Sequence, residues 1–73
     1  MKSVIGEVIH RYRMQSGLSQ DQLVDKIDMS KAFLSEIERG IKMPSVETLF
    51  RISKALGVNA SEIVVEIEKE LKL

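Results

Sequence analysis

The 73-residue sequence contains no cysteine and no tryptophan, and it has one proline, one tyrosine and two phenylalanines. The lack of cysteine excludes disulfide bridges, thiolate metal sites and cysteine nucleophiles, and it fits a reducing compartment. No apolar run approaches the roughly 20 residues of a membrane span, and the N-terminus lacks a hydrophobic signal segment. We therefore expect a cytoplasmic protein with no membrane partner. A chain of this length suits a single domain over residues 1–73.

An excess of one charge sign is also missing, because eleven Lys and Arg residues balance eleven Asp and Glu residues. Nucleic-acid-binding proteins often carry a basic excess, so the neutral charge argues against binding through bulk positive charge. Any positive surface must come from the local placement of a few side chains.

Catalytic patterns are equally scarce. The sequence shows no nucleophile and base pair, no carboxylate dyad and no phosphate-binding loop, so we predict no enzymatic activity and no cofactor. His10 is the only histidine, and Glu7 is the one carboxylate near it in sequence. Two such side chains do not complete a metal site, so we predict that His10 is a surface residue and that no metal is bound.

The sequence does contain clear start and stop signals for helices. Glycine suits the left-handed position after a helix, and short polar residues suit the cap before one. Ser19 with Gln22 and Asn59 with Glu62 resemble reciprocal capping boxes, and Pro44 separates the third segment from the fourth. With stops at glycines and caps at serines, we predict five helices and an all-α fold: Val4 to Ser16, Gln20 to Lys26, Lys31 to Arg39, Val46 to Leu56 and Ala60 to Leu71.

Apolar residues recur in these segments at spacings of three and four, which predicts one buried stripe on each helix. The two short helices are marginal alone and need to pack against the longer ones. The predicted stripes consist of Ile5, Val8, Ile9 and Tyr12; Leu23, Val24 and Ile27; Leu34 and Ile37; Leu49, Ile52, Ala55 and Leu56; and Ile63, Val64, Ile67 and Leu71.

The segment 20–39 has the spacing of a helix-turn-helix, with two short helices joined by a turn at residues 27–29. In this motif the first helix braces against the DNA backbone, and the second presents its N-terminal residues to base edges in the major groove. If Leu34 and Ile37 face the core, the outward side of the second helix carries the candidate base-reading residues Lys31, Ala32, Ser35 and Glu36.

Further stretches of the sequence match a known pattern in register over residues 5–64: Ile5-Gly6, Arg13, Gly17-Leu18-Ser19-Gln20, Leu23, Met29-Ser30, Phe33-Leu34-Ser35, Ile37-Glu38-Arg39-Gly40, Pro44-Ser45, Leu49 and Ala55-Leu56-Gly57-Val58. In these stretches the sequence resembles the lambda-repressor-like or Cro-like helix-turn-helix regulators, often called the XRE family. The resemblance implies a five-helix lambda-repressor-like DNA-binding domain.

The resemblance implies roles for individual residues. Gln20 corresponds to a residue that contacts a DNA phosphate from the start of the second helix. Arg13 and Glu38 fall where the family often has a partly buried ion pair that joins the first helix to the third. The resemblance implies backbone contacts for Ser30, Arg39 and Lys42, and base contacts for Lys31, Ala32, Ser35 and Glu36.

Two departures from the family pattern bear on the site. Asp28 stands where the family usually has glycine in the turn, and a left-handed backbone there would cost roughly 1 kcal/mol, or less for aspartate. Glu36 places a carboxylate near DNA, where phosphates repel it unless it accepts a hydrogen bond from a cytosine amino group. We expect Glu36 to set specificity by exclusion, with a solvated surface carboxylate as the alternative.

One recognition helix reads only about four or five base pairs, so such modules usually pair across a two-fold axis on palindromic half-sites. We predict a homodimer through the C-terminal helix 60–71, with Val64, Val65, Ile67 and Leu71 at its interface. The alternative is a helix folded back on its own domain. The predicted function is a DNA-binding transcriptional regulator, a repressor or an autoregulating controller; the alternatives are a DNA-binding antitoxin that holds a toxin, and a protein-interaction module without DNA binding.

Overall fold

The computed structural model describes residues 3–72, which form five α-helices and no strand. The all-α prediction is confirmed. The predicted helix ends are correct to within one residue, since the third and fourth helices each stop one residue earlier than predicted and the other ends agree. The helices are α1 (Val4–Ser16), α2 (Gln20–Lys26), α3 (Lys31–Glu38), α4 (Val46–Ala55) and α5 (Ala60–Leu71). Within residues 3–72, no helix is long and apolar enough to cross a membrane.

Serine caps begin four of the five helices. Ser19 forms the predicted capping box, in which its Oγ accepts from the Gln22 N–H at 3.0 Å and its own N–H donates to Gln22 Oε1 at 2.8 Å. Ser30 and Ser45 cap α3 and α4 through single hydrogen bonds, and Ser3 caps α1. The predicted capping box at Asn59 is wrong, because the Asn59 side chain makes no cap hydrogen bond to α5.

The turn between α2 and α3 corrects a second expectation. Outside the glycines, Lys72 is the one residue between 3 and 72 with a positive φ, so Asp28 does not adopt a left-handed backbone. Instead Ile27, the residue that follows α2, has an extended backbone (φ −133°, ψ 155°). The chain therefore turns without the strain that a left-handed aspartate would carry, which explains why glycine is not needed here.

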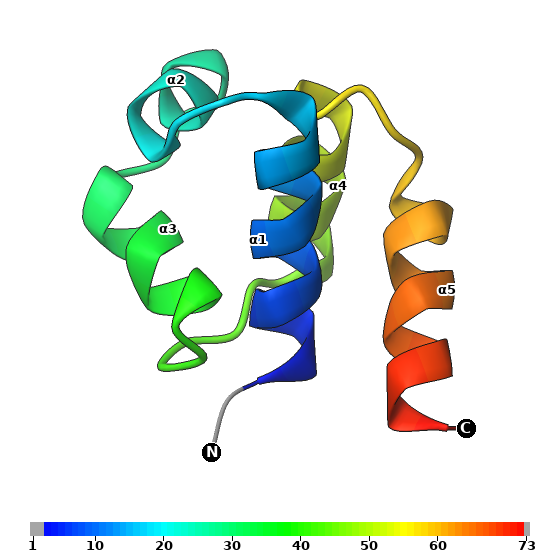
Figure 1. Ribbon diagram of the computed structural model, residues 1–73. Coiled ribbons are helices and arrows are strands. Elements are labelled where there is room, and N and C mark those ends of the chain that lie inside the picture. Colours follow the sequence, from blue (N-terminus) through cyan, green and yellow to red (C-terminus); the bar gives the residue numbers. More distant parts are fainter. Residues whose placement is uncertain (1–2, 73) are drawn as a thin grey trace.

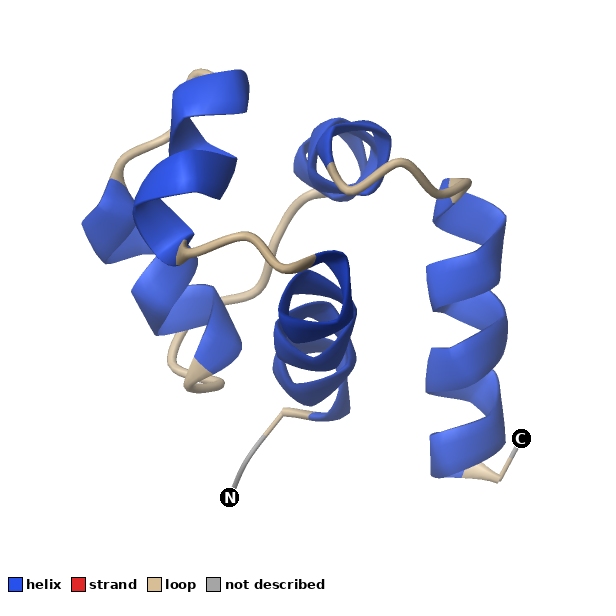
Figure 2. Cartoon of the chain, turned by 45° about the horizontal axis from the view of Figure 1, so that its top comes forward, coloured by secondary structure: helices blue, strands red, loops and turns tan. Residues whose placement is uncertain are grey.

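Helix α1 lies at the centre of the fold. It packs against α3 on one side and α5 on the other, while α2 packs on α3 and α4 contacts both α2 and α5. Figure 1 shows α2 and α3 on the opposite side of α1 from α5. Figure 2, viewed from another angle, shows the same order, with α1 between α3 and α5. The helix-turn-helix is thus supported from behind by α1 and α4.

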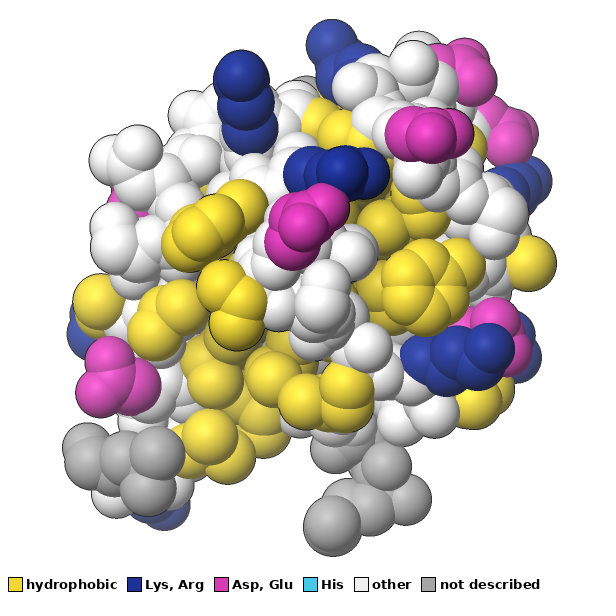
Figure 3. Space-filling model, turned by 180° about the vertical axis from the view of Figure 1, so that it is seen from behind, with side chains coloured by type: hydrophobic (Ala, Val, Ile, Leu, Met, Phe, Trp, Pro, Cys, Tyr) yellow, Lys and Arg dark blue, Asp and Glu magenta, His cyan; other side chains and the backbone are white. Residues whose placement is uncertain are grey.

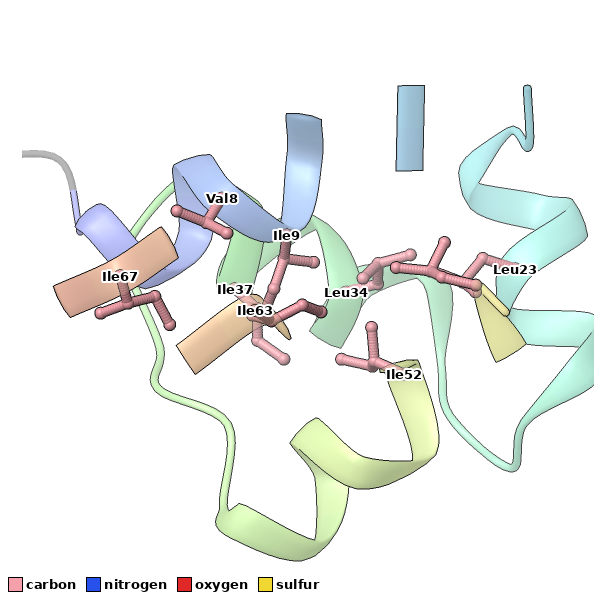
Figure 4. Packing of buried hydrophobic residues seen from close by; sticks show 9 residues of the cluster. Val8, Ile9, Leu23, Leu34, Ile37, Ile52, Ile63 and Ile67 are labelled. Atoms are coloured by element: carbon pink, nitrogen blue, oxygen red, sulfur yellow. The ribbon is translucent and has the colours of Figure 1, made fainter. Parts of the chain in front are cut away.

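The core lies where these helices meet (Figure 4). All its buried apolar residues belong to the predicted stripes: Val8, Ile9, Leu23, Leu34, Ile37, Ile52, Leu56, Ile63 and Ile67. Other predicted stripe residues, among them Ile5, Tyr12 and Leu49, are partly buried against this cluster. Val64 and Leu71 of the apolar stripe of α5 are 41% and 47% exposed, as a place at the predicted dimer interface requires.

The crossing of α1 and α3 is unusually close at Gly6, which is buried. A Cβ atom at this position would collide with the backbone carbonyl oxygen of Ile37 and crowd that of Glu38. Because backbone atoms cannot rotate away as side chains do, only glycine fits here. This contact sets how near the third helix lies to the first.

Candidate nucleic-acid interface

The outward face of α3 is held in place by the two side chains on its opposite face. Leu34 and Ile37 are fully buried in the core. Their burial leaves Lys31 and Ala32 exposed and Ser35 half-buried on the other side of the helix. Helix α2 braces this arrangement, because Leu23 is buried in the same cluster and α2 packs directly on α3. A polar edge on a fixed helix is the form that major-groove reading requires.

Glu38 joins the three helices around this face. Its side chain is 4% exposed and pairs with Arg13, whose Nε donates to Oε2 at 2.7 Å and whose other guanidinium nitrogen donates to Oε1 at 2.9 Å. Oε1 also accepts from the amide nitrogen of Gln20 at 3.2 Å and lies 2.9 Å from His10 Nδ1. The ion pair that the resemblance implies is therefore present, and it extends to α2 through Gln20.

The environment of Glu38 keeps it ionised. Burial by itself raises the pKa of this carboxyl, but hydrogen bonds from Arg13, His10 and Gln20 favour the charged form and together lower the pKa below its ordinary value. The buried carboxylate and the Arg13 guanidinium neutralise each other. The pair thus positions helices and adds no net charge to the surface.

Gln20 is oriented by this network. One of its two amide hydrogens is donated to Glu38 Oε1, and the second remains available because a side-chain amide carries two donors. The contact also identifies which end of the amide is nitrogen, since an ionised carboxylate can only accept. Gln20 therefore keeps a second N–H donor at the start of α2, and a contact with a phosphate requires such a donor.

Two basic side chains of the predicted site are paired with carboxylates. Lys31 Nζ lies 3.3 Å from Asp21 Oδ2, and Lys42 Nζ lies 3.7 Å from Glu36 Oε1. Lys42 also lies over the Phe33 ring, 5.9 Å from its centroid. Exposed ion pairs of this kind are worth about 1 kcal/mol or less, so a DNA phosphate or base can replace the carboxylate partner.

Arg39 differs from the lysines. Its Nε donates to the backbone carbonyl of Ser35 at 3.3 Å, and no carboxylate of residues 3–72 pairs with it. Arg39 is exposed at the end of α3. Its charge is therefore directly available to a phosphate.

A pocket of about 400 Å³ opens where α1, α2 and α3 meet. The structure brings three of the predicted DNA-binding residues together here, and three further residues from α1 and α3 complete the lining: Glu7, His10, Gln20, Ser35, Glu38 and Arg39. Ser30 lies elsewhere, in a smaller pocket that Thr48 and Arg51 of α4 also line. The candidate interface thus has a polar concave part beside the exposed face of α3.

Sequence reasoning placed His10 on the surface without a role and left Glu7 outside the site. Both could have been found from helix spacing, because residues 7, 10 and 13 are three apart and share one side of α1. Arg13 had already been assigned to the contact with α3, so its neighbours on that side were candidates for the same junction. In residues 3–72, no three His, Asp or Glu side chains gather in a way that could hold a metal ion.

The C-terminal helix offers a smaller apolar surface than predicted. Val64, Val65 and Leu71 are 41%, 45% and 47% exposed. Ile67 is 9% exposed and belongs to the core of its own domain, so little of its side chain is available for the predicted dimer interface. Its position one turn after Ile63 directs it to the same buried side of α5.

A second exposed apolar surface was missed. It lies on the loop after α3 and on α4, and it consists of Ile41, Met43, Val46 and Phe50, each at least 58% exposed. Figure 3 shows hydrophobic side chains gathered on the face opposite to the view of Figure 1. Helical periodicity did not reveal this surface because two of its residues lie outside any helix and the others lie off the buried stripe of α4.

The family model described as helix-turn-helix matches residues 9–63 of the chain, which include α2, the turn and α3. The chain belongs to the XRE-type helix-turn-helix family. Among relatives in this helix-turn-helix family, the HTH-type transcriptional regulator y4dJ of Sinorhizobium fredii is 36% identical, over 88% of this chain and 83% of that protein. The control protein C.BamHI of Bacillus amyloliquefaciens is 31% identical, over 88% of this chain and 80% of its own length.

A solved helix-turn-helix structure is similar in fold as well. The master regulator for biofilm formation SinR, in complex with DNA, superposes with a TM-score of 0.76 and 34% identity, over 82% of this chain and 97% of that chain. The relative y4dJ is named as an HTH-type transcriptional regulator, and this chain is a transcriptional regulator with a helix-turn-helix DNA-binding fold.

Proposed function

We propose that this chain binds DNA in a sequence-specific manner, with α3 in the major groove, and acts as a repressor or an autoregulating controller of transcription. The observation that carries the proposal is the outward face of α3. Lys31 and Ala32 are exposed and Ser35 is half-buried on a helix whose other face is locked by Leu34 and Ile37. The DNA complex of the similar protein SinR supports the same type of partner for this chain.

In this proposal four further predicted residues contact the DNA backbone. Gln20 and Arg39 bind backbone phosphates, because both line the polar pocket beside α3 and each keeps N–H donors beyond the one it gives to Glu38 or to the Ser35 carbonyl. Ser30 and Lys42 contact the backbone from the two ends of α3. Phosphate contacts position the domain, whereas base contacts carry the sequence preference.

Glu36 reads sequence by exclusion. Its carboxylate is 30% exposed and Lys42 lies 3.7 Å away, which lowers the repulsion that a bare carboxylate would feel near phosphates. A carboxylate can accept a hydrogen bond from the cytosine amino group but not from the acceptors of guanine or thymine in the major groove. We expect a base preference at the position that Glu36 faces.

The test of this function starts from duplexes selected by binding from a random DNA pool. Lys31→Ala and Ser35→Ala should each weaken binding to the selected site by about 1–3 kcal/mol and relax the preference at one position. Lys54→Ala is the matched control, because Lys54 is an exposed lysine near the end of α4. Unchanged affinity and site preference in both α3 variants would refute the recognition-helix assignment.

Salt dependence separates DNA binding from the alternative of a protein-interaction module. Phosphate contacts make the logarithm of the association constant fall linearly with the logarithm of salt concentration. For a chain with eleven positive and eleven negative side chains, a steep slope would show that a few local contacts act in place of bulk charge. A flat response would favour the interaction module.

We further propose a homodimer on palindromic half-sites about 34 Å apart, with Val64, Val65 and Leu71 of α5 at its interface. Val65→Glu should shift the chain from dimer to monomer in sedimentation equilibrium, because it places a charge in an apolar contact. Val46→Glu is the matched control on the apolar surface of α4, where Val46 is 68% exposed. If only the Val46→Glu variant is monomeric, the dimer interface lies on α4 and not on α5.

A further inference from the structure

The pocket between α1, α2 and α3 contains one histidine, His10, and an imidazole ring can hold a second proton and a positive charge. It is 51% exposed, and its Nδ1 lies 2.9 Å from Oε1 of the buried Glu38 carboxylate. It shares the pocket with Gln20, Ser35 and Arg39, which are predicted DNA contacts. His10 therefore stands on the face that the proposed function assigns to DNA.

Glu38 determines which ring nitrogen of His10 carries the proton. The carboxylate is ionised and can only accept, so the contact at 2.9 Å requires a hydrogen on Nδ1. Arg13 Nη2 lies 3.2 Å from Nδ1 and can only donate, so it makes no hydrogen bond to the protonated ring nitrogen and donates to the same Glu38 oxygen at 2.9 Å. With Nδ1 protonated, Nε2 is an acceptor in the neutral ring and becomes a donor only when the ring gains its second proton.

The charge of His10 also decides the sign of the pocket. Arg13 and Glu38 neutralise each other at 2.7 Å. The charged groups left around the pocket are Glu7 and Arg39, which have opposite signs. The pocket is thus neutral when the imidazole is neutral and carries one positive charge when it is protonated.

The remaining neighbours of α1 do not alter this balance. From α2, Gln20 faces the pocket with an uncharged amide. The acidic residues Glu66 and Glu70 of α5 act on Arg11, and Glu70 accepts a hydrogen bond from Arg11 at 3.1 Å. Figure 1 shows α5 on the opposite side of α1 from α3, and therefore away from this pocket.

We propose that protonated His10 binds a DNA backbone phosphate through Nε2, beside Gln20 and Arg39, and so makes DNA affinity depend on pH. This inference rests on the proposed DNA-binding function. Neutral His10 presents a lone pair to the phosphate, whereas the imidazolium presents a donor and a positive charge. DNA binding is therefore tighter when the ring holds its second proton than when it is neutral.

The experiment measures binding of the full chain to a duplex selected from a random pool, at about pH 6 and about pH 8 with matched ionic strength. At the lower pH we expect roughly fivefold tighter binding per module, and a salt slope steeper by about 0.9 per added phosphate contact. His10→Asn retains a donor for Glu38 but lacks Nε2, so this variant should lose both the affinity difference and the slope difference.

The matched control restores a histidine elsewhere. Ser61→His added to His10→Asn places an exposed histidine on α5, and the double variant should behave as His10→Asn does. Thermal unfolding at both pH values checks that each variant is folded, and His10→Gln provides a second neutral replacement.

The proposal would be overturned, while the DNA-binding function stands, by a wild-type affinity that does not change with pH or by a His10→Asn variant that keeps the wild-type difference. A double variant that regains the pH dependence would also overturn it, because the effect would then not depend on the pocket. Failure of the chain to bind any duplex at either pH would overturn the proposed function, and this inference with it.

Discussion

Replacement of Glu38 by glutamine should destabilise the protein far more than the same change at an exposed carboxylate. Glu38 is 4% exposed and its partner Arg13 is 8% exposed, so Glu38→Gln leaves a buried guanidinium without its counter-charge. Removing one member of a buried pair costs about 3–5 kcal/mol. A 73-residue chain has a total stability of about 4–11 kcal/mol at 0.05–0.15 kcal/mol per residue. The variant should therefore stand close to unfolding.

The assay is urea denaturation followed by circular dichroism, with Glu47→Gln as the matched control. Glu47 is 75% exposed and pairs with Arg51 at 2.7 Å. Exposed pairs contribute about 1 kcal/mol or less, so the control should unfold close to the wild type. A Glu38→Gln variant that loses no more stability than Glu47→Gln would refute the assignment of Glu38 as the residue that joins the three helices.

The same carboxylate predicts a pH dependence of stability. Its pKa is lowered in the folded protein from the ordinary value of 4.5. A lowered folded pKa contributes stability that is complete above the ordinary value and is lost as pH falls through the folded value. The wild type should therefore lose stability in acid below about pH 4.5, and Glu38→Gln should lack this component.

Two further predictions concern the backbone. Gly6→Ala should lower the free energy of unfolding by about 1–3 kcal/mol, because the new Cβ collides with the carbonyl oxygen of Ile37. The measurement is the melting temperature. A value equal to that of the wild type would show that α1 and α3 can move apart at no cost in stability. Asp28→Gly should destabilise by up to about 1 kcal/mol, since the backbone at Asp28 is not left-handed and glycine only adds freedom to the unfolded chain. A stabilised glycine variant would mean that this turn is strained.

The helix ends and the core residues could be predicted from the sequence because their signals act over short distances. A serine cap bonds to an N–H three residues later, as Ser30 does with Phe33 at 3.1 Å, and a buried stripe repeats every three or four residues. The outward position of Lys31 and Ala32 followed from the inward position of Leu34 and Ile37 on the same short helix. These features required no knowledge of how the helices pack.

Other features depended on contacts between distant segments. The choice between Val64 and Ile67 as the buried residue depends on which side of α5 meets α1, and the periodicity of α5 alone allowed both. The role of His10 depends on Glu38, which lies 28 residues away along the chain. The missing side-chain cap at Asn59 and the absence of a left-handed backbone at Asp28 depend on the conformation of the loops that contain them. The sequence by itself determined five helices, their ends to within one residue, and a helix-turn-helix in a chain without an excess of positive charge. Only the tertiary structure decided which surfaces of those helices remain exposed and which charges neutralise each other, because burial and pairing arise when separate helices come into contact.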